Sequence, residues 1–543
     1  MDPARPIAQA IALQGETIIA VGPETEIFSL VGPETVTIHG HGGTLLPGFF
    51  DSHCHLFLGG SELGHLDLSK SVPGRDIGDA IRHYANENPL RAILLVQGVD
   101  YAVFVAKSPR AYLDHILSDR ALAVMSGDHH TVWANTAALT ACGLLNGQNT
   151  PQGSEIVMGA DGLATGELRE PGAFARILSL AGQDRAALGL STGEEPDPAP
   201  SKSDRATDRG MLRTAAHHLA AQGITSAVNM DGNLYTLSLL SELHAQGDLP
   251  IRVQVAFHFK PHMDLPDLNK ASAMMRDWQD DWLRGGLVKM FLDGVLDSRT
   301  AFTLHDYPGA PGVRGAPLFT PERFAQIATE ADKRGLQIAV HAIGDGAVRA
   351  TIDGYAAARV ANGPRDSRHR IEHIELIDPA DLPRLAENGI VASLQPAHVP
   401  GAMDFPMEPV ASIIGQDRWA DAFRCASLGA PLVFGSDWPV ADVSVLRGLQ
   451  AHLTRPKWRD DLADERISLN DALAAYTIGG AWASHCDNRR GMLKPGYLAD
   501  LTLLDGDIAS TPHGKIDTLQ VALTICGGRI TFRNPNTSRK VHQ

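Results

Sequence analysis

One stretch of this 543-residue chain decides its fold: Val288-Lys289-Met290-Phe291-Leu292-Asp293-Gly294. An apolar run that ends at a polar residue and a glycine is typical of a short buried β-strand followed by a turn. Lys289 and Phe291 are two positions apart, so their side chains lie on the same face of the strand, and we expect that face to point into the interior. A strand-end lysine usually reaches solvent or pairs with a carboxylate, so an inward-facing lysine indicates a special role.

Other apolar runs of the chain also end in residues that bind metal ions. These residues follow strand-like segments in the order His53, His55, His341, His373 and Asp437. Two histidines at positions i and i+2 of a strand share one face, so one metal ion can bind both of them. Four imidazoles, one carboxylate and a lysine suit a centre of two divalent metal ions that performs hydrolysis. Because an ammonium group cannot bind a cation, we expect Lys289 to bridge the ions as a carbamate.

Eight runs of strand length recur along the chain, and most of them are separated by helical patterns. They cover residues 49–55, 224–230, 252–257, 287–291, 337–341, 370–374, 391–395 and 432–437. Strands that alternate with helices predict an α/β protein with a parallel sheet, and eight such units predict a (β/α)8 TIM barrel over residues 47–487. The carboxyl ends of all barrel strands meet at one face, so the sequence predicts that the metal-binding residues converge there.

The segment of chain between the first two runs has far too many residues for one crossover helix. We therefore expect a large insertion after the first strand, at about residues 60–205, which ends in a polar, proline-rich linker at 193–208. An insertion in the first βα loop belongs to the catalytic face, so we expect it to cover the active site. The chain ends, residues 1–46 and 488–543, alternate short apolar runs with glycine and proline and look like halves of one β-rich domain.

Charge and cysteine content exclude several classes of protein. A net charge of −16 without a basic stripe argues against nucleic acid or an anionic membrane as a partner. No apolar run approaches the length of a membrane span, and the first residues lack the apolar core of a signal peptide. The cysteines are scattered at Cys54, Cys142, Cys425, Cys486 and Cys526, with no CxxC pair. Because these cysteines form no disulfide pattern, we expect the protein to belong to the reducing cytoplasm. A homodimer is compatible with the sequence.

The order His-x-His, Lys, His, His, Asp resembles the amidohydrolase superfamily in its two-metal, carboxylated-lysine form. Six ordered motifs narrow the resemblance to the YtcJ-like branch, which includes N-substituted formamide deformylases. These motifs are residues 47–55, 128–130 with Asn135, 223–226, 297–301, 341–345 and 436–439, and the similarity runs from about residue 10 to Asp505. The resemblance implies a carboxylated Lys289 and a small β-sandwich built from both chain ends.

Two residues are candidates for the chemistry itself. Asp437 would hold a metal ion, act as the general acid/base on the attacking water and pass the proton to the leaving nitrogen. The alternative for Asp437 is a helix cap, because Pro439 follows two residues later. His398, which follows the seventh strand, is expected to polarise the scissile carbonyl.

Four further residues are candidates for substrate binding: Asp128, His129, Arg299 and Trp438. Asp128 and His129 lie in the insertion, where they either reach the substrate or cap the following helix. Arg299 lies in the loop after the lysine strand, and it binds a carbonyl or carboxylate of the substrate or forms a structural ion pair. Trp438 directly follows Asp437.

Together these features predict a hydrolase of two divalent metals that cleaves the C–N bond of a linear amide, either an N-substituted formamide or an N-acyl amine. Zinc is the default for a nitrogen-rich ligand set, and Fe²⁺ or Mn²⁺ fits the same donors. The expected partner is a small-molecule amide. The alternatives are a mononuclear deaminase, against which Lys289 argues, and a cyclic amidase. A non-enzymatic scaffold would be expected to lose at least one ligand, and this chain keeps all of them.

Overall fold

The computed structural model describes residues 2–68, 77–89, 91–104, 108–127, 129, 131–150, 154–169, 171–403 and 407–537. Its central feature is a sheet of eight parallel strands that are neighbours in chain order. The strands are β4 (Phe49–Cys54), β11 (Ile224–Asn229), β12 (Arg252–His258), β13 (Leu283–Phe291), β14 (Gln337–Ala342), β15 (Arg370–His373), β16 (Val391–Leu394) and β17 (Leu432–Phe434). Each of the eight predicted strands is present, which confirms the (β/α)8 barrel.

The barrel closes where the chain after β17 meets β4. The backbone N–H of Asp437 donates to the carbonyl of His53 at 2.7 Å, and the N–H of His55 donates to the carbonyl of Trp438 at 2.8 Å. Cys54 pairs in parallel with Trp438 between these two bonds. The backbone contacts that close the barrel are therefore made by the residues that sequence analysis assigned to the metal centre.

Helices connect the barrel strands on the outside of the sheet, as the alternating pattern predicted. The main ones are α8 (Lys202–Ala221), α9 (Leu234–Ala245), α10 (Leu268–Asp277), α11 (Pro321–Lys333), α12 (Asp345–Asn362), α13 (Leu382–Glu387) and α15 (Val445–Thr454). The prediction of a linker over residues 193–208 was wrong in its second half, because α8 already begins at Lys202. Ser201 and Asp204 form a reciprocal capping box there, which satisfies the first backbone donors and starts the helix early.

Residues Phe57–Ser191 form a compact unit of their own between β4 and β11. Its sheet has six strands, in the order β5 (Leu66–Asp67), β6 (Ile93–Val99), β7 (Ala121–Ser126), β8 (Thr131–Ala134), β10 (Ala164–Arg169) and β9 (Glu155–Met158). Two separate apolar clusters pack on this sheet, one around Phe174 and the other around Trp133. That this unit covers the active site stays a prediction.

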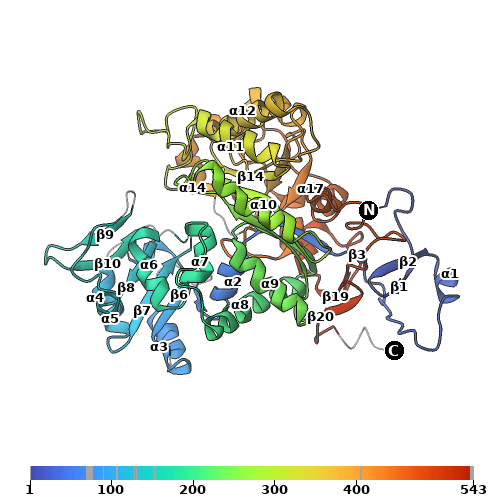
Figure 1. Ribbon diagram of the computed structural model, residues 1–543, viewed down its shortest axis with the longest axis horizontal. Coiled ribbons are helices and arrows are strands. Elements are labelled where there is room, and N and C mark those ends of the chain that lie inside the picture. Colours follow the sequence, from blue (N-terminus) through green and yellow to red (C-terminus); the bar gives the residue numbers. More distant parts are fainter. Residues whose placement is uncertain are drawn as a thin grey trace. The chain divides into compact units, whose positions relative to one another are not determined.

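Both chain ends contribute strands to two small antiparallel sheets (Figure 1). One pairs β1 (Ala10–Gln14) with β2 (Thr17–Gly22), and the other has the order β20 (Arg529–Arg533), β19 (Val521–Cys526), β18 (Leu501–Leu504) and β3 (Leu45–Pro47). Ile18 of β2 shares an apolar core with Leu501 and Leu523 of the larger sheet. No helix of the described part of the chain is long and apolar enough to cross a membrane.

Gly435 is needed for the close approach of β17 to β4. A Cβ atom added at Gly435 would lie 2.5 Å from the backbone nitrogen of His53, closer than any real contact. We expect Gly435→Ala to lower the thermal unfolding midpoint by several degrees, because the closing strands must separate. Gly210→Ala, in α8 with open space around the new methyl group, should leave the midpoint unchanged or slightly raised. Equal midpoints for wild type and Gly435→Ala would contradict the tight closure.

Candidate metal centre

The end of β4 presents two histidines to one carboxylate. The Nε2 atoms of His53 and His55 lie 3.2 and 2.9 Å from Oδ1 of Asp437, which follows β17. All three side chains are buried. The i, i+2 spacing thus places both imidazoles on one face, as predicted, and the barrel closure brings Asp437 to them.

Two further carboxylates orient these imidazoles, and sequence analysis did not assign them. Nδ1 of His53 lies 2.7 Å from Oε2 of Glu372, and Nδ1 of His55 lies 2.6 Å from Oδ1 of Asp231. Metal-binding histidines commonly donate the N–H of their other nitrogen to a carboxylate in this way, which leaves Nε2 as the ligand. Glu372 directly precedes His373 and Asp231 follows β11, so their position at strand ends was the available signal.

This hydrogen bonding tests whether the site fits a cation. With both Nδ1 atoms protonated, the lone pairs of two Nε2 atoms and one carboxylate oxygen face each other, which is unfavourable unless a proton or metal ion lies among them. Burial alone lowers the pKa of His55, but the charges and hydrogen bonds of Asp231 and Asp437 raise that pKa to about 9. The donor set therefore attracts positive charge and fits a divalent metal ion.

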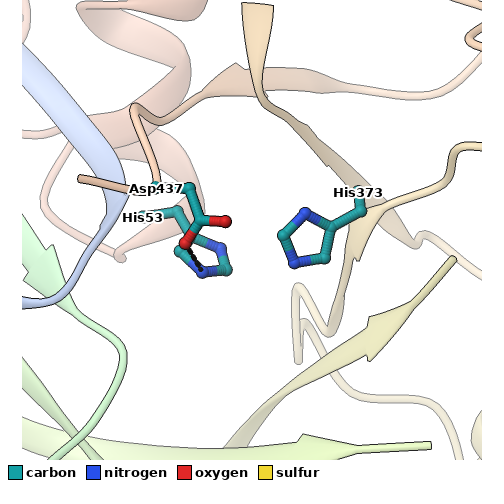
Figure 2. A group of neighbouring side chains, drawn as sticks. All are labelled: His53, His373 and Asp437. Atoms are coloured by element: carbon teal, nitrogen blue, oxygen red, sulfur yellow. Dashed lines mark ion pairs between the residues drawn. The ribbon is translucent and has the colours of Figure 1, made fainter. Parts of the chain in front are cut away.

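His373 approaches the same point from β15 (Figure 2). One ligand atom each from His53, His373 and Asp437 lies within 4.8 Å of the others. Nδ1 of His373 is buried and makes no hydrogen bond within the described residues. Figure 2 shows His373 facing the carboxylate of Asp437 across the site. A buried imidazole nitrogen without a partner is costly, and a metal ion would satisfy it.

His341 joins the group from the neighbouring strand β14. Its ring centroid lies 4.5 Å from that of His373. Nε2 of His341 lies 3.1 Å from the carbonyl oxygen of Gly294, so this nitrogen carries the proton and Nδ1 is left as the ligand. Burial and the charge of the nearby Lys289 together lower the pKa of His341 to about 3, which keeps the imidazole neutral.

Lys289 is fully buried on the inner face of β13, as its alternation with Met290 predicted. Its Nζ lies 4.8 Å from the centroid of the Phe291 ring and makes no hydrogen bond within the described part of the chain. Burial lowers the pKa of Lys289 to about 8 despite the charges of Glu372 and Asp437. A buried amine with a lowered pKa is the form that reacts with carbon dioxide.

The backbone is strained at two residues of the group. His373 has a φ of 77° and Asp437 a φ of 58°, in the left-handed region that residues other than glycine rarely adopt. Strain of this kind persists where the surrounding structure enforces it, and it is concentrated at functional sites. Burial alone would raise the pKa of Asp437, but His53 and His55 lower it well below its ordinary range, so the carboxylate is ionised.

His398 lies beside this group at the end of the short 3₁₀ turn Pro396–His398. Its Nε2 is 3.5 Å from Oδ2 of Asp437, and its Nδ1 is 3.7 Å from Oε1 of Glu375. The His398 ring stacks on His373 with 5.8 Å between centroids. His398 thus lies next to the second carboxylate oxygen of Asp437, and its expected role at the scissile carbonyl stays a prediction.

The predicted substrate-binding residues are not gathered in one place. Asp128 lies outside the described residues. Nε2 of His129 lies 3.1 Å from Oε1 of Glu62, within the unit that follows β4. Arg299 is exposed in the loop after β13, and the Trp438 side chain is buried against His218 of α8 at 5.3 Å. The substrate role of all four stays a prediction.

The sequence of the chain matches a known family over nearly its whole length. Residues 37–532 match the profile described as "Amidohydrolase family". The chain belongs to this family. Membership agrees with the arrangement of candidate ligands at the strand ends of the barrel, and it shows that the protein is a hydrolase.

Several relatives of this amidohydrolase share almost its full length. It is 31% identical to "Protein LONG AFTER FAR-RED 3" of Arabidopsis thaliana, over 97% of this chain and 89% of that protein. It is 28% identical to "Putative amidohydrolase YtcJ" of Bacillus subtilis, over 96% of both, and 26% identical to "N-substituted formamide deformylase" of Arthrobacter pascens, over 97% and 95%. An uncharacterized metal-dependent hydrolase of Pyrococcus horikoshii has the same fold, with a TM-score of 0.73 and 24% identity over 93% of this chain and 95% of that one.

The carboxylate of Asp231 should strengthen metal binding through His55. We expect Asp231→Asn to weaken binding of Zn²⁺ by roughly 10- to 100-fold, because an amide keeps the geometry but makes the imidazole a poorer ligand. Competition with a chromophoric chelator measures this affinity. Asp264→Asn, which changes an exposed carboxylate paired with Arg323, is the matched control and should bind Zn²⁺ as the wild type does. An unchanged affinity in Asp231→Asn would contradict the orienting role.

Proposed function

We propose that this amidohydrolase cleaves the C–N bond of a linear amide, an N-substituted formamide or N-acyl amine, with two divalent metal ions. The observation that carries the proposal is the convergence of His53, His55 and Asp437, together with a buried lysine whose Nζ makes no hydrogen bond to any described residue. His53, His55 and Asp437 would hold one ion, His341 and His373 the other, and a carboxylated Lys289 would bridge them. The similarity to an N-substituted formamide deformylase supports an acyclic amide as the substrate.

The ions, with zinc as our first choice, supply positive charge that acidifies a water molecule and polarises the amide carbonyl. The side chains of the protein would orient the metal ligands and transfer the proton. Glu372 and Asp231 fix the rings of His53 and His55, so that the ligands need not reorganise during the reaction.

Asp437 is placed to move the proton. One of its oxygens faces His53 and His55, and the other faces His398. Oδ2 would accept the proton of the attacking water and then deliver it to the departing amine nitrogen. His398, held by Glu375, lies where it would donate a hydrogen bond to the carbonyl oxygen as negative charge develops there.

The bridging role of Lys289 predicts a metal count. Purified protein should contain close to two divalent ions per chain by elemental analysis, and Lys289→Ala should lose at least one of them and most activity. Short-chain acids such as acetate should restore part of the activity, because a free carboxylate can take the place of the carbamate. Lys260→Ala changes a second lysine near the Phe291 ring and should keep both ions. Full activity in Lys289→Ala, or one ion per chain in the wild type with added zinc and carbon dioxide, would favour the mononuclear deaminase instead.

The acid–base role of Asp437 is tested by Asp437→Asn. We expect turnover of an N-substituted formamide to fall by a factor of roughly 10² to 10⁴, because the amide oxygen still binds metal but cannot accept and return a proton. Metal content should stay close to that of the wild type. Asp442→Asn removes a nearby carboxylate that pairs with Arg447 and should keep full turnover. Near wild-type turnover in an Asp437→Asn variant with both metals would remove Asp437 from the mechanism.

A further inference from the structure

A pocket lies next to the metal centre, at the carboxyl ends of β15 and β16. His373 and His398 line one part of it, and Gln395, His452 and Arg455 line another. These last three side chains are buried, yet polar atoms of each have no partner within the described residues. Buried polar groups are nearly always satisfied in proteins, so a pocket lined by three such side chains is suited to a polar ligand.

Arg455 is the most informative of the three. It directly follows α15, and its side chain forms no ion pair or hydrogen bond with any described residue, although only 6% of the residue is exposed. Glu465 and Asp464 lie close enough for an electrostatic interaction with Arg455. The carboxylate of Glu465, however, accepts hydrogen bonds from the N–H groups of Cys425 and Ser427 and from the Ser427 hydroxyl, and Asp464 pairs with Arg466. A buried guanidinium without a counter-ion is strongly unfavourable, so the pocket is suited to an anion.

Gln395 and His452 add hydrogen-bond donors to the same pocket. Both side-chain atoms of the Gln395 amide are unpartnered in the described chain, and this residue is 4% exposed. Both ring nitrogens of His452 are likewise unpartnered, and the ring stacks on Phe434 at 4.4 Å, which fixes its orientation. A guanidinium, an amide and an imidazole together match the several acceptor sites of a carboxylate.

The other charged residues of the pocket each pair with a neighbour, although Nε of Arg424 has no hydrogen-bond partner among the described residues. Arg424 donates to the Ser427 hydroxyl at 3.1 Å and lies 3.6 Å from Asp421. Glu375 faces His398 at 3.7 Å. Arg455 is therefore the charge that a ligand would have to neutralise.

We propose that this pocket is a carboxylate subsite, in which Arg455, Gln395 and His452 bind a carboxylate group that lies beyond the amide bond cleaved at the metal centre. The assignment to a substrate rests on the proposed function, whereas the affinity of the pocket for a carboxylate does not. The substrate class becomes N-substituted formamides or N-acyl amines that carry a carboxylate. The acid released by hydrolysis has the same chemistry, and the experiment distinguishes the two sources.

The first measurement is the binding of butanoate by calorimetry to the metal-loaded enzyme. We expect Arg455→Met to weaken butanoate binding by roughly 10- to 100-fold, since a charged hydrogen-bonding partner is lost. Arg459→Met removes an exposed arginine paired with Asp461 and should bind butanoate as the wild type does. Any binding of butanoate to the metals is common to all variants. Equal affinity in wild type and Arg455→Met overturns the proposal.

The second measurement compares N-formyl-β-alanine with N-formylpropylamine, which differ in the carboxylate. We expect the wild type to prefer the acid by roughly 10- to 100-fold in kcat/KM, and Arg455→Met to cleave the acid and the neutral amide with similar kcat/KM. If butanoate binding depends on Arg455 but the two amides are cleaved equally, the subsite holds the released acid. If neither amide is cleaved and that dependence persists, the subsite stands and the proposed function fails.

Protein stability separates this role from a structural one. Arg455→Met should keep or raise the thermal unfolding midpoint, because it removes a buried charge without a partner. A large fall in the midpoint would show that Arg455 stabilises the fold and would count against the subsite. In that case Gln395→Leu is the second variant, and unchanged butanoate affinity in it overturns the proposal.

Discussion

The closure of the barrel between β17 and β4 is the constraint on which the site depends. The N–H groups of Asp437 and His55 bond across this seam to the carbonyls of His53 and Trp438. The same residues carry three of the side chains that converge at the candidate metal centre. Positions of ligands are thus fixed by backbone hydrogen bonds rather than by long flexible side chains, which gives the precision that metal binding requires.

Many of the buried ionisable groups are compensated by a neighbouring charge. Arg370 donates from Nε to Oε1 of Glu372 at 2.9 Å and from Nη2 to Oε2 at 3.1 Å, and Glu372 in turn accepts from His53. Burial alone would raise the pKa of Glu372, but Arg370 and His53 lower it to about 2. This buried chain of charges orients His53 as a ligand. Lys289 and Arg455 are exceptions, because Nζ of Lys289 and Nη1 of Arg455 have no hydrogen-bond partner among the described residues. In the two proposals, carboxylation would change Lys289 and a bound carboxylate would pair with Arg455.

The two proposals assign different tasks to neighbouring parts of the barrel face. The seam and β13 to β15 provide the hydrolytic centre, and the ends of β15 and β16 with α15 provide the pocket that would select the substrate. In barrel enzymes, chemistry at the strand ends is combined with loops that vary in specificity. Shared fold and family therefore do not determine the substrate of this chain, whereas the unpaired Arg455 gives a physical reason to expect an anionic one.

The sequence by itself determined the barrel and the order of its candidate metal ligands. Periodic apolar runs mark buried parallel strands, and residues at their carboxyl ends must meet on one face, so His53, His55, Lys289, His341, His373 and Asp437 could be named from position alone. The start of α8 was missed because its polar first turn resembles a linker until the Ser201–Asp204 capping box is recognised. Tertiary structure alone decided the pairing of Glu372 with His53, of Asp231 with His55, and of Gln395, His452 and Arg455 around one pocket. These contacts join residues that are far apart in sequence, and they depend on the direction of each side chain. Local periodicity predicts neither the long-range partner nor that direction.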